Sequence, residues 1–297
     1  MKIIVTGASG FIGKNLLERI DKEHQYTTFN RKSKFRIKDE EVIIHLAGKA
    51  HDLTKTANPQ EYYDSNTTLT KKIYNEFIRS EAQVLIIMSS IKAIIDSTET
   101  IITEKTKENP KTHYGKSKLQ ADQYIISKPI PTGKRIYILR PCMIHGKGNK
   151  GNLNLLYNLI KKGIPWPLGA FVNKRSYCSI ENLLFIIQEL IANSEIPSGI
   201  YNIADDDSLS TTEVITLIGR TTNIKTRIYT IPRVLIKIVA KIGDLTYLPL
   251  NSERLQKLTE SYIVDNSKIK QALNKPLPVT SKDGLAHTFK SFYENER

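Results

Sequence analysis

The chain has 297 residues, of which 40% are apolar and 25% are charged, and its formal net charge is +14. This length and composition allow a buried core without disulfides, which excludes a disordered protein and a small disulfide-rich domain. The positive charge favours an anionic partner, which could be a phosphate-bearing ligand, nucleic acid or a membrane surface. The lysines are scattered outside one basic block at 31–38, so nucleic acid is disfavoured, although a solvated lysine-rich surface would look the same.

Cys142 and Cys178 are the only cysteines, so at most one disulfide could form, and they lack the spacing of a metal site. No apolar run approaches the ~20 residues that span a bilayer, and the first residues lead directly into a strand. We therefore expect a cytoplasmic protein with no bound metal and no stable membrane insertion.

Strands and helices alternate along the first half of the chain. Residues 1–6 predict a strand that runs into Gly7, and apolar residues then recur at helical spacing from 11 to 20. The other expected strands are at 26–29, 41–46, 84–88 and 135–139, and the expected helices are at 59–79 and 114–127. This alternation is typical of a Rossmann-like, doubly wound parallel sheet of the α/β class.

Beyond Pro141, glycines and prolines divide the chain into shorter pieces, which predicts a smaller α/β substrate lobe. A strand at 201–204 would return to the main sheet, so the two lobes are expected to be interleaved. We expect a dinucleotide-binding domain at 1–145 with a returning segment at about 176–204. The substrate lobe would then comprise 146–175 and 205–297.

The segment 6–13, TGASGFIG, joins the first strand to the first helix and has glycines at 7, 10 and 13. Such glycines allow a tight turn and let a pyrophosphate approach the helix N-terminus. Their spacing resembles that of the short-chain dehydrogenase/reductase superfamily. The cofactor contacts expected here are Gly7, Ser9, Gly10, Phe11, Ile12 and Gly13.

The second expected strand is followed by Asn30, Arg31 and Lys32. A fold that prefers NAD usually places a carboxylate there, to bind the ribose 2′-hydroxyl. Two cations suit a 2′-phosphate instead, so NADP is favoured, with NAD as the alternative.

Tyr114 and Lys118 lie four residues apart on a predicted helix, so both side chains share one face. A tyrosine with a pKa of about 10 shuttles protons poorly at neutral pH, but a neighbouring ammonium and a nicotinamide cation would stabilise its phenolate. Ser90 follows the strand at 84–88, where ligands bind in open parallel sheets, and would hydrogen-bond the substrate oxygen. Ser89 is the structural alternative.

These motifs together resemble the extended short-chain dehydrogenase/reductases of the NAD-dependent epimerase/dehydratase family, which act on nucleotide sugars. The resemblance covers nearly the whole chain. It implies further cofactor contacts from two segments, HLAG at 45–48 and RPCMIHG at 140–146. The residues concerned are Leu46, Ala47, Gly48, Pro141 and Cys142.

The same resemblance implies residues that bind the UDP-sugar. Arg175, in the segment KRSYCSI, would clamp the substrate diphosphate, although Ser176 stands where the family commonly has Asp. Asn152 would contact the diphosphate or the sugar, and Arg254 is a second candidate for a phosphate contact or else a solvated helix residue.

Ile91 and Lys92 follow Ser90, at the two positions where dehydratases of the family carry Asp and Glu. Without those carboxylates, dehydration is disfavoured. The strings MSSIKA and 150–169 are similar to bacterial family members that reduce a UDP-2-acetamido-2,6-dideoxy-4-hexulose for capsule and O-antigen synthesis. In that reaction Lys92 would contact the sugar or form a structural salt bridge.

Two other interpretations remain. A UDP-hexosamine 4-epimerase would use the same Ser, Tyr and Lys and retain its NAD. A non-catalytic NADP-binding scaffold is compatible with the fold, but it has no need for an activated tyrosine. A homodimer and the role of the apolar segment 231–250 are also left open.

Overall fold

The computed structural model describes residues 1–19, 24–29, 36–49, 58–98, 100–149, 151–246 and 250–294. Its main sheet has six parallel strands in the order β2-β1-β3-β4-β5-β8. The strands are β1 (Lys2–Thr6), β2 (Gln25–Phe29), β3 (Val42–His45), β4 (Val84–Met88), β5 (Arg135–Pro141) and β8 (Gly199–Ile203). This arrangement confirms the predicted Rossmann-like fold.

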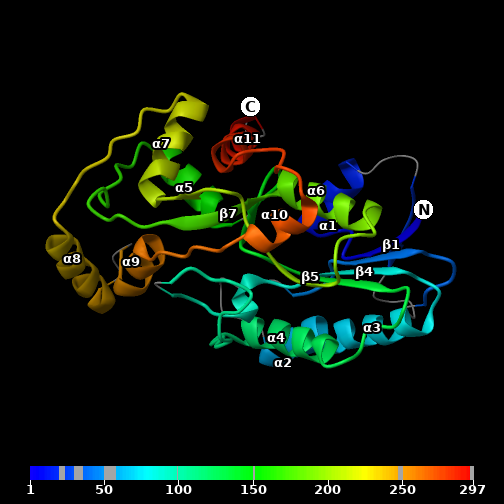
Figure 1. Cartoon of the computed structure of the whole chain (residues 1–297). Helices are drawn as coiled ribbons and strands as arrows, with labels where there is room; N and C mark the ends of the chain where they lie inside the picture. Colours follow the sequence, from blue (N-terminus) through cyan, green and yellow to red (C-terminus); the bar gives the residue numbers. More distant parts are fainter. Residues whose placement is uncertain are drawn as a thin grey trace.

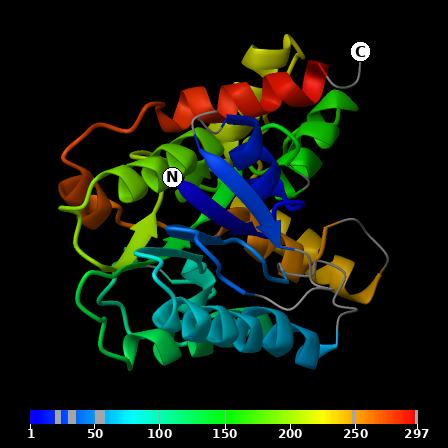
Figure 2. The ribbon, with the colours of Figure 1, turned by 90° about the vertical axis from the view of Figure 1, so that its right-hand side faces the viewer.

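Helices cover both faces of this sheet (Figure 1). On one face lie α1 (Phe11–Arg19) and α6 (Ile180–Ala192). On the other face lie α2 (Pro59–Tyr62), a π-helical turn (Tyr63–Thr68), α3 (Leu69–Arg79) and α4 (His113–Ile126). The turned view in Figure 2 shows α3 below the strands and the C-terminal helix above them.

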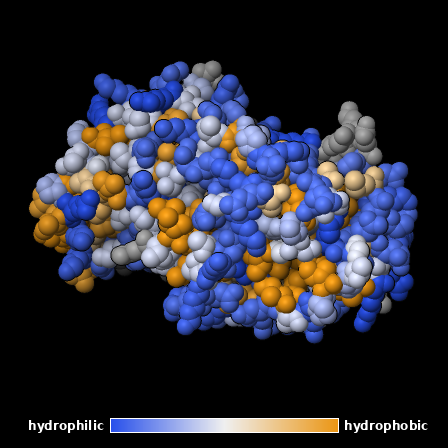
Figure 3. Space-filling model, in the orientation of Figure 1, coloured by the Kyte–Doolittle hydropathy of each residue, from blue (hydrophilic) through white to orange (hydrophobic). Residues whose placement is uncertain are grey.

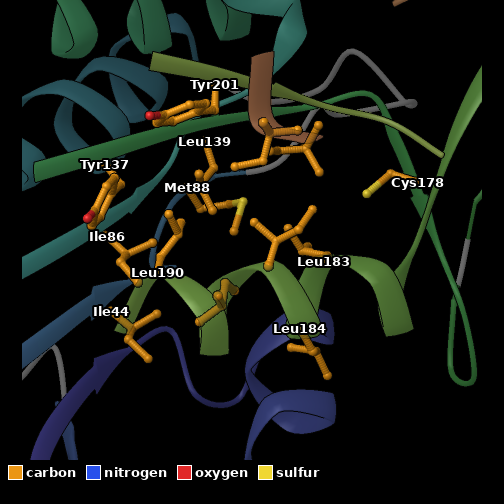
Figure 4. Packing of buried hydrophobic residues seen from close by; sticks show 14 of the residues in the cluster. Ile44, Ile86, Met88, Tyr137, Leu139, Cys178, Leu183, Leu184, Leu190 and Tyr201 are labelled. Atoms are coloured by element: carbon orange, nitrogen blue, oxygen red, sulfur yellow. The ribbon is translucent and has the colours of Figure 1, made fainter. Parts of the chain in front are cut away.

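The core follows from the alternation of side chains along buried strands. Ile3 and Val5 of β1 pack on the α6 side, whereas Ile4 packs on the α3 side. Figure 4 shows Leu183 and Leu190 of α6 facing Ile44, Ile86, Met88 and Leu139 of the sheet. These side chains belong to one apolar layer between the helix and the sheet. A sheet buried on both faces holds its strand ends in fixed positions, which matters for the site below.

A second, smaller unit contains β6 (Met143–His145), β7 (Arg175–Ser179) and β9 (Ser208–Leu209), in the order β6-β7-β9. Its helices are α5 (Asn152–Lys161), α7 (Thr211–Thr222), α8 (Arg233–Leu245), α9 (Ser252–Thr259) and α11 (Ser281–Glu294), whereas α10 (Ser267–Leu273) packs into the core of the main sheet beside β8. The division into two lobes at the expected boundaries stays a prediction.

Cys142 and Cys178 are both buried free thiols. Among the helices of the described ranges, none is long and apolar enough to cross a bilayer.

Candidate active site

The glycine turn between β1 and α1 is so tight that it leaves no room for a Cβ atom at Gly7 or Gly13. Gly7 has a φ of 75°, and a Cβ there would lie 2.6 Å from the backbone nitrogen of Ala47. A Cβ on Gly13 would lie 2.4 Å from the Gly7 carbonyl oxygen, and Gly10 donates its N–H to that same oxygen at 3.0 Å. The turn therefore brings the N-terminus of α1, with its unpaired N–H groups, to the end of β1, a position that suits a pyrophosphate.

Other predicted cofactor contacts surround this turn. Ser9 is exposed, whereas Phe11 and Ile12 are half-buried at the start of α1. Asn30, Arg31 and Lys32 lie outside the described residues, so their contribution to cofactor choice stays a prediction.

The end of β3 is held by a buried polar network. The ring of His45 hydrogen-bonds the hydroxyl of Thr6 at 2.7 Å through Nδ1 and that of Thr70 at 2.9 Å through Nε2. Burial lowers the pKa of His45 to about 3, and the nearby Lys118 adds to the effect, so this histidine is neutral. It acts as a structural support for the segment that follows, Leu46–Gly48.

Gly48 lies against Lys118 of α4, the helix predicted to be catalytic. A Cβ on Gly48 would lie 2.7 Å from Oδ1 of Asn66 and 3.1 Å from Nζ of Lys118. Asn66, in the π-helical turn, also donates to the hydroxyl of Ser117 on α4 at 3.0 Å. The predicted cofactor segment at β3 and the predicted catalytic helix thus meet where only a glycine fits.

Ser90, Tyr114 and Lys118 come together where β4 ends beside α4. Ser90 forms a side-chain hydrogen bond with Tyr114. Lys118 donates from Nζ to the carbonyl oxygen of Met88, the last residue of β4, at 2.8 Å. α4 begins where the hydroxyl of Thr112 accepts from the N–H of Gly115 at 3.1 Å, and this cap places Tyr114 in the first turn.

Burial dominates the electrostatics of this trio. It raises the pKa of the Tyr114 hydroxyl above its usual value, against the opposing effect of the Ser90 hydrogen bond. Burial also lowers the pKa of Lys118 to about 8, and Asp122 partly opposes this shift. At neutral pH the tyrosine is therefore a protonated donor beside a lysine that is still charged.

A buried ion pair supports the trio from behind. Asp122 accepts from Nε of Arg140 at 2.8 Å and from the hydroxyl of Ser89 at 2.8 Å, and both charged side chains are 1% exposed. Arg140 also lies 3.6 Å from Glu108, which is partly exposed. The hydroxyl of Ser89 thus points into this ion pair, which fits the structural role that the sequence left open for it.

The buried ion pair of Asp122 and Arg140 was not predicted from the sequence, although a signal for Asp122 was present. Asp122 lies four residues after Lys118, so Tyr114, Lys118 and Asp122 form one row along α4. Asn66 and Thr70 had no comparable signal, because their partners lie on other elements: Thr70 bonds His45, 25 residues away, and Asn66 bonds Ser117, 51 residues away.

Pro141 is the last residue of β5 and Cys142 follows it, and both are buried. The N–H of Cys142 donates to the carbonyl oxygen of Ile203 at 3.0 Å, and burial raises the pKa of its thiol well above the usual value. A thiol in this state is unreactive and serves as apolar lining.

The structure brings Lys92 and Arg175, two of the predicted substrate contacts, together beside Tyr262. The ammonium of Lys92 binds the carbonyl oxygen of Asp96 and lies 4.7 Å from the centre of the Tyr262 ring. The backbone of Arg175 forms an isolated β-bridge with the backbone of Tyr262. The guanidinium of Arg175 forms an ion pair with Glu260 at 3.2 Å. Burial lowers the pKa of Lys92.

The other two predicted substrate contacts lie on separate helices. Asn152 is the exposed first residue of α5, and Arg254 is exposed on α9, whose first turn is capped by Asn251. Their roles at the substrate stay predictions.

The chain belongs to the NAD-dependent epimerase/dehydratase family, whose model matches residues 3–204. It is 27% identical over 98% of its length to a Vibrio cholerae protein named UDP-glucose 4-epimerase, 95% of which is covered. It is 29% identical over 52% of its length to a UDP-2-acetamido-2,6-beta-L-arabino-hexul-4-ose reductase of Pseudomonas aeruginosa, 38% of which is covered.

Solved structures share this fold over the whole chain. The structure of RMD from Pseudomonas aeruginosa complexed with NADPH matches with a TM-score of 0.75 and 17% identity, covering 99% of this chain and 100% of that one. The UDP-N-acetylglucosamine 4-epimerase from Bacillus cereus matches with a TM-score of 0.73 and 22% identity, covering 99% of each chain.

Proposed function

We propose that this protein reduces the C4 keto group of a UDP-4-keto-6-deoxy-N-acetylhexosamine, giving a product of the UDP-N-acetylquinovosamine type. The observation that carries the proposal is the Ser90–Tyr114 hydrogen bond at the end of β4, with no carboxylate at positions 91 and 92. Membership of a family that acts on nucleotide sugars, and similarity to a named hexulose reductase, support the substrate class.

The residues of this site suit proton donation to a forming alkoxide. A bound reduced nicotinamide cofactor supplies the hydride that adds to C4. The raised pKa of Tyr114 keeps its hydroxyl protonated until the C4 oxygen becomes basic enough to take that proton. Ser90 orients the same oxygen, and the charge of Lys118 favours the phenolate that remains until solvent returns a proton.

Dehydration is disfavoured by what occupies the two positions after Ser90. Ile91 is buried in the main core, and the ammonium of Lys92 is engaged by Asp96 and Tyr262. Elimination of water needs an acid and a base at the sugar, and neither residue provides a carboxylate.

We propose NADPH as the reductant because Arg31 and Lys32 suit a 2′-phosphate. An Arg31→Asp variant should weaken binding of NADPH much more than binding of NADH. Equal effects on the two cofactors would assign Arg31 to the surface. The setting would be surface polysaccharide synthesis in the cytoplasm.

A UDP-hexosamine 4-epimerase with retained NAD is the second candidate. It is favoured by the similarity over nearly full length to the Vibrio cholerae protein and by an Escherichia coli O157:H7 relative, 26% identical over 96% of this chain, named as a 4-epimerase of a lipid-linked N-acetylglucosamine. An epimerase needs the tyrosine as both base and acid, whereas a reductase needs only the acid. A binding scaffold would have no use for the buried Ser90, Tyr114 and Lys118 set.

The test is to supply UDP-4-keto-6-deoxy-N-acetylglucosamine with NADPH and identify the product by NMR. We expect NADPH consumption in proportion to a 4-hydroxy product. Interconversion of UDP-N-acetylglucosamine and UDP-N-acetylgalactosamine without added cofactor would replace the reductase assignment with the epimerase.

A further inference from the structure

Helix α8 packs onto the protein through only three buried residues. Its buried positions are Ile236, Ala240 and Gly243, which lie on one side of the helix. Gly243 is so close to the following segment that a Cβ there would lie 1.9 Å from the carbonyl oxygen of Leu250. The contact with the rest of the protein is therefore tight but narrow.

The opposite side of α8 is apolar and exposed. Six large apolar side chains are 44% to 90% exposed and fall on one continuous arc at helical spacing. They are Val234, Leu235, Ile238, Val239, Ile242 and Leu245. We call these six residues the outer face of α8. Figure 3 shows hydrophobic residues gathered at the end of the molecule where Figure 1 places α8.

Cations flank the outer face along one edge. Lys237 and Lys241 are exposed and lie beside the apolar arc at helical spacing. The acidic residue of this edge, Asp244, accepts from the N–H of Ser252 at 2.8 Å and from its hydroxyl at 2.6 Å. The Asp244 carboxylate is therefore turned toward α9.

At the N-terminal end of the helix a further cation is held in place. Arg233 donates to the carbonyl oxygen of Ala170 at 2.8 Å and lies over the Phe171 ring. The next residue, Val172, is 78% exposed and extends the apolar surface near the start of α8.

We propose that the outer face of α8 lies flat on an anionic lipid surface. An apolar arc of this width, bordered by lysines, has the form of helices that sit at the boundary between headgroups and acyl chains. The apolar side chains would enter the boundary while Lys237 and Lys241 contact anionic headgroups. The net charge of +14 supports the same choice over an apolar interface between two copies, which would place the lysines of both copies together.

The test is flotation of the full chain with vesicles of equimolar phosphatidylglycerol and phosphatidylcholine, and with vesicles of phosphatidylcholine alone. The chain should float with the anionic vesicles, and added salt should release it. An Ile238→Glu, Ile242→Glu variant should bind at least ~10-fold more weakly, and so should a Lys237→Glu, Lys241→Glu variant.

Matched controls separate the helix from general stickiness and charge. Ile126→Glu changes a residue of α4 that is 52% exposed, against 49% for Ile238. A Lys72→Glu, Lys290→Glu variant makes the same change in net charge on α3 and α11. Both controls should bind anionic vesicles as the wild type does, and all variants should keep its circular dichroism spectrum.

Three outcomes would overturn the proposal. One is absence of the wild-type chain from the floating fraction. Another is equal loss of binding in the controls and in the α8 variants. The third is a wild-type dimer, seen by sedimentation without vesicles, that the Ile238→Glu, Ile242→Glu variant makes monomeric, because the outer face would then be covered by a second copy.

Discussion

Two regions of the molecule differ in how deeply their charged side chains are buried. One lies where β4 ends beside α4, and the other lies around Arg175 of β7 and its partner Glu260. At the first, Ser89, Asp122 and Arg140 are buried and hydrogen-bonded to one another beneath Tyr114 and Lys118. At the second, Arg175 pairs with Glu260, and both side chains are partly exposed.

We propose that this difference separates a fixed reaction centre around Tyr114 from an adaptable binding surface around Arg175. Asp122 holds both Ser89 and Arg140 at 2.8 Å, and neither charge of the buried pair can move away without leaving the other uncompensated, so the pair holds its surroundings in place. Partly exposed ion pairs contribute little to stability and can exchange one partner for another. On this proposal, Arg175 would exchange Glu260 for a phosphate of the substrate, whereas Arg140 stays paired with the buried Asp122.

Tyr114→Phe should have the largest effect on activity. Removing the hydroxyl removes the proton donor, so turnover should fall by ~10²- to 10⁴-fold while cofactor binding persists. Turnover on the proposed substrate and cofactor fluorescence titration measure the two quantities. Turnover at the wild-type rate would show that another group donates the proton.

Asp122→Asn should have the largest effect on stability. It leaves the Arg140 guanidinium buried without its charged partner, which should lower the free energy of unfolding by about 3 kcal/mol in urea titration. Glu108→Gln is the matched control, because it removes only the partly exposed contact of Arg140 at 3.6 Å. Equal losses in the two variants would mean that the buried pair is not special.

Lys118→Met should stabilise the chain while abolishing activity. The pKa of Lys118 falls from its ordinary 10.5 to about 8, so the buried ammonium costs about 3 kcal/mol at neutral pH. Loss of the hydrogen bond to the Met88 carbonyl offsets part of this, leaving a gain of about 1–2 kcal/mol without cofactor.

The lowered pKa of Lys118 should also make the stability of the wild type depend on pH. Between pH 8 and 10.5 the folded chain has released the Lys118 proton and the unfolded chain still holds it, so this group makes wild-type stability rise with pH. Lys118→Met lacks that rise, so its advantage over the wild type should vanish by about pH 9.5 and reverse by pH 10.5. A gap that is constant or widens above pH 8 would contradict the assignment.

Arg175→Gln should have the smallest effect on stability, under about 1 kcal/mol, because its partner Glu260 is partly exposed. If Arg175 binds the substrate diphosphate, KM should nevertheless rise by about tenfold with little change in kcat. Glu260→Gln is the control, since it breaks the same ion pair and leaves the guanidinium available. A rise in KM in both variants would indicate a structural role for the pair.

Sequence alone predicted the main sheet well because its central strands β1, β3, β4 and β5 are short, largely apolar and followed by a turn or helix signal. The segments 1–6, 26–29, 41–46, 84–88 and 135–139 all correspond to observed strands. Parallel sheets place such strand ends at one edge, so the juxtaposition of Ser90 with Tyr114 could also be anticipated.

The rest depended on contacts between distant segments. β7 and β9 are short, and their pairing joins residues about 30 apart with no periodic signal of their own. Glu260, which forms an ion pair with Arg175, lies 85 residues from it in the sequence. The orientation of α8 was also hidden, because its apolar pattern fits a buried helix equally well and only its packing shows which face is exposed.

The most direct test of the proposed reaction follows the hydride itself. The enzyme would be given UDP-4-keto-6-deoxy-N-acetylglucosamine and NADPH deuterated at the transferred position, and the product examined by NMR and mass spectrometry. The account predicts one deuterium at C4 of the sugar for each NADPH oxidised, and no dehydrated product. Conversion of a UDP-hexosamine to its C4 epimer with no deuterium from the added cofactor would contradict it.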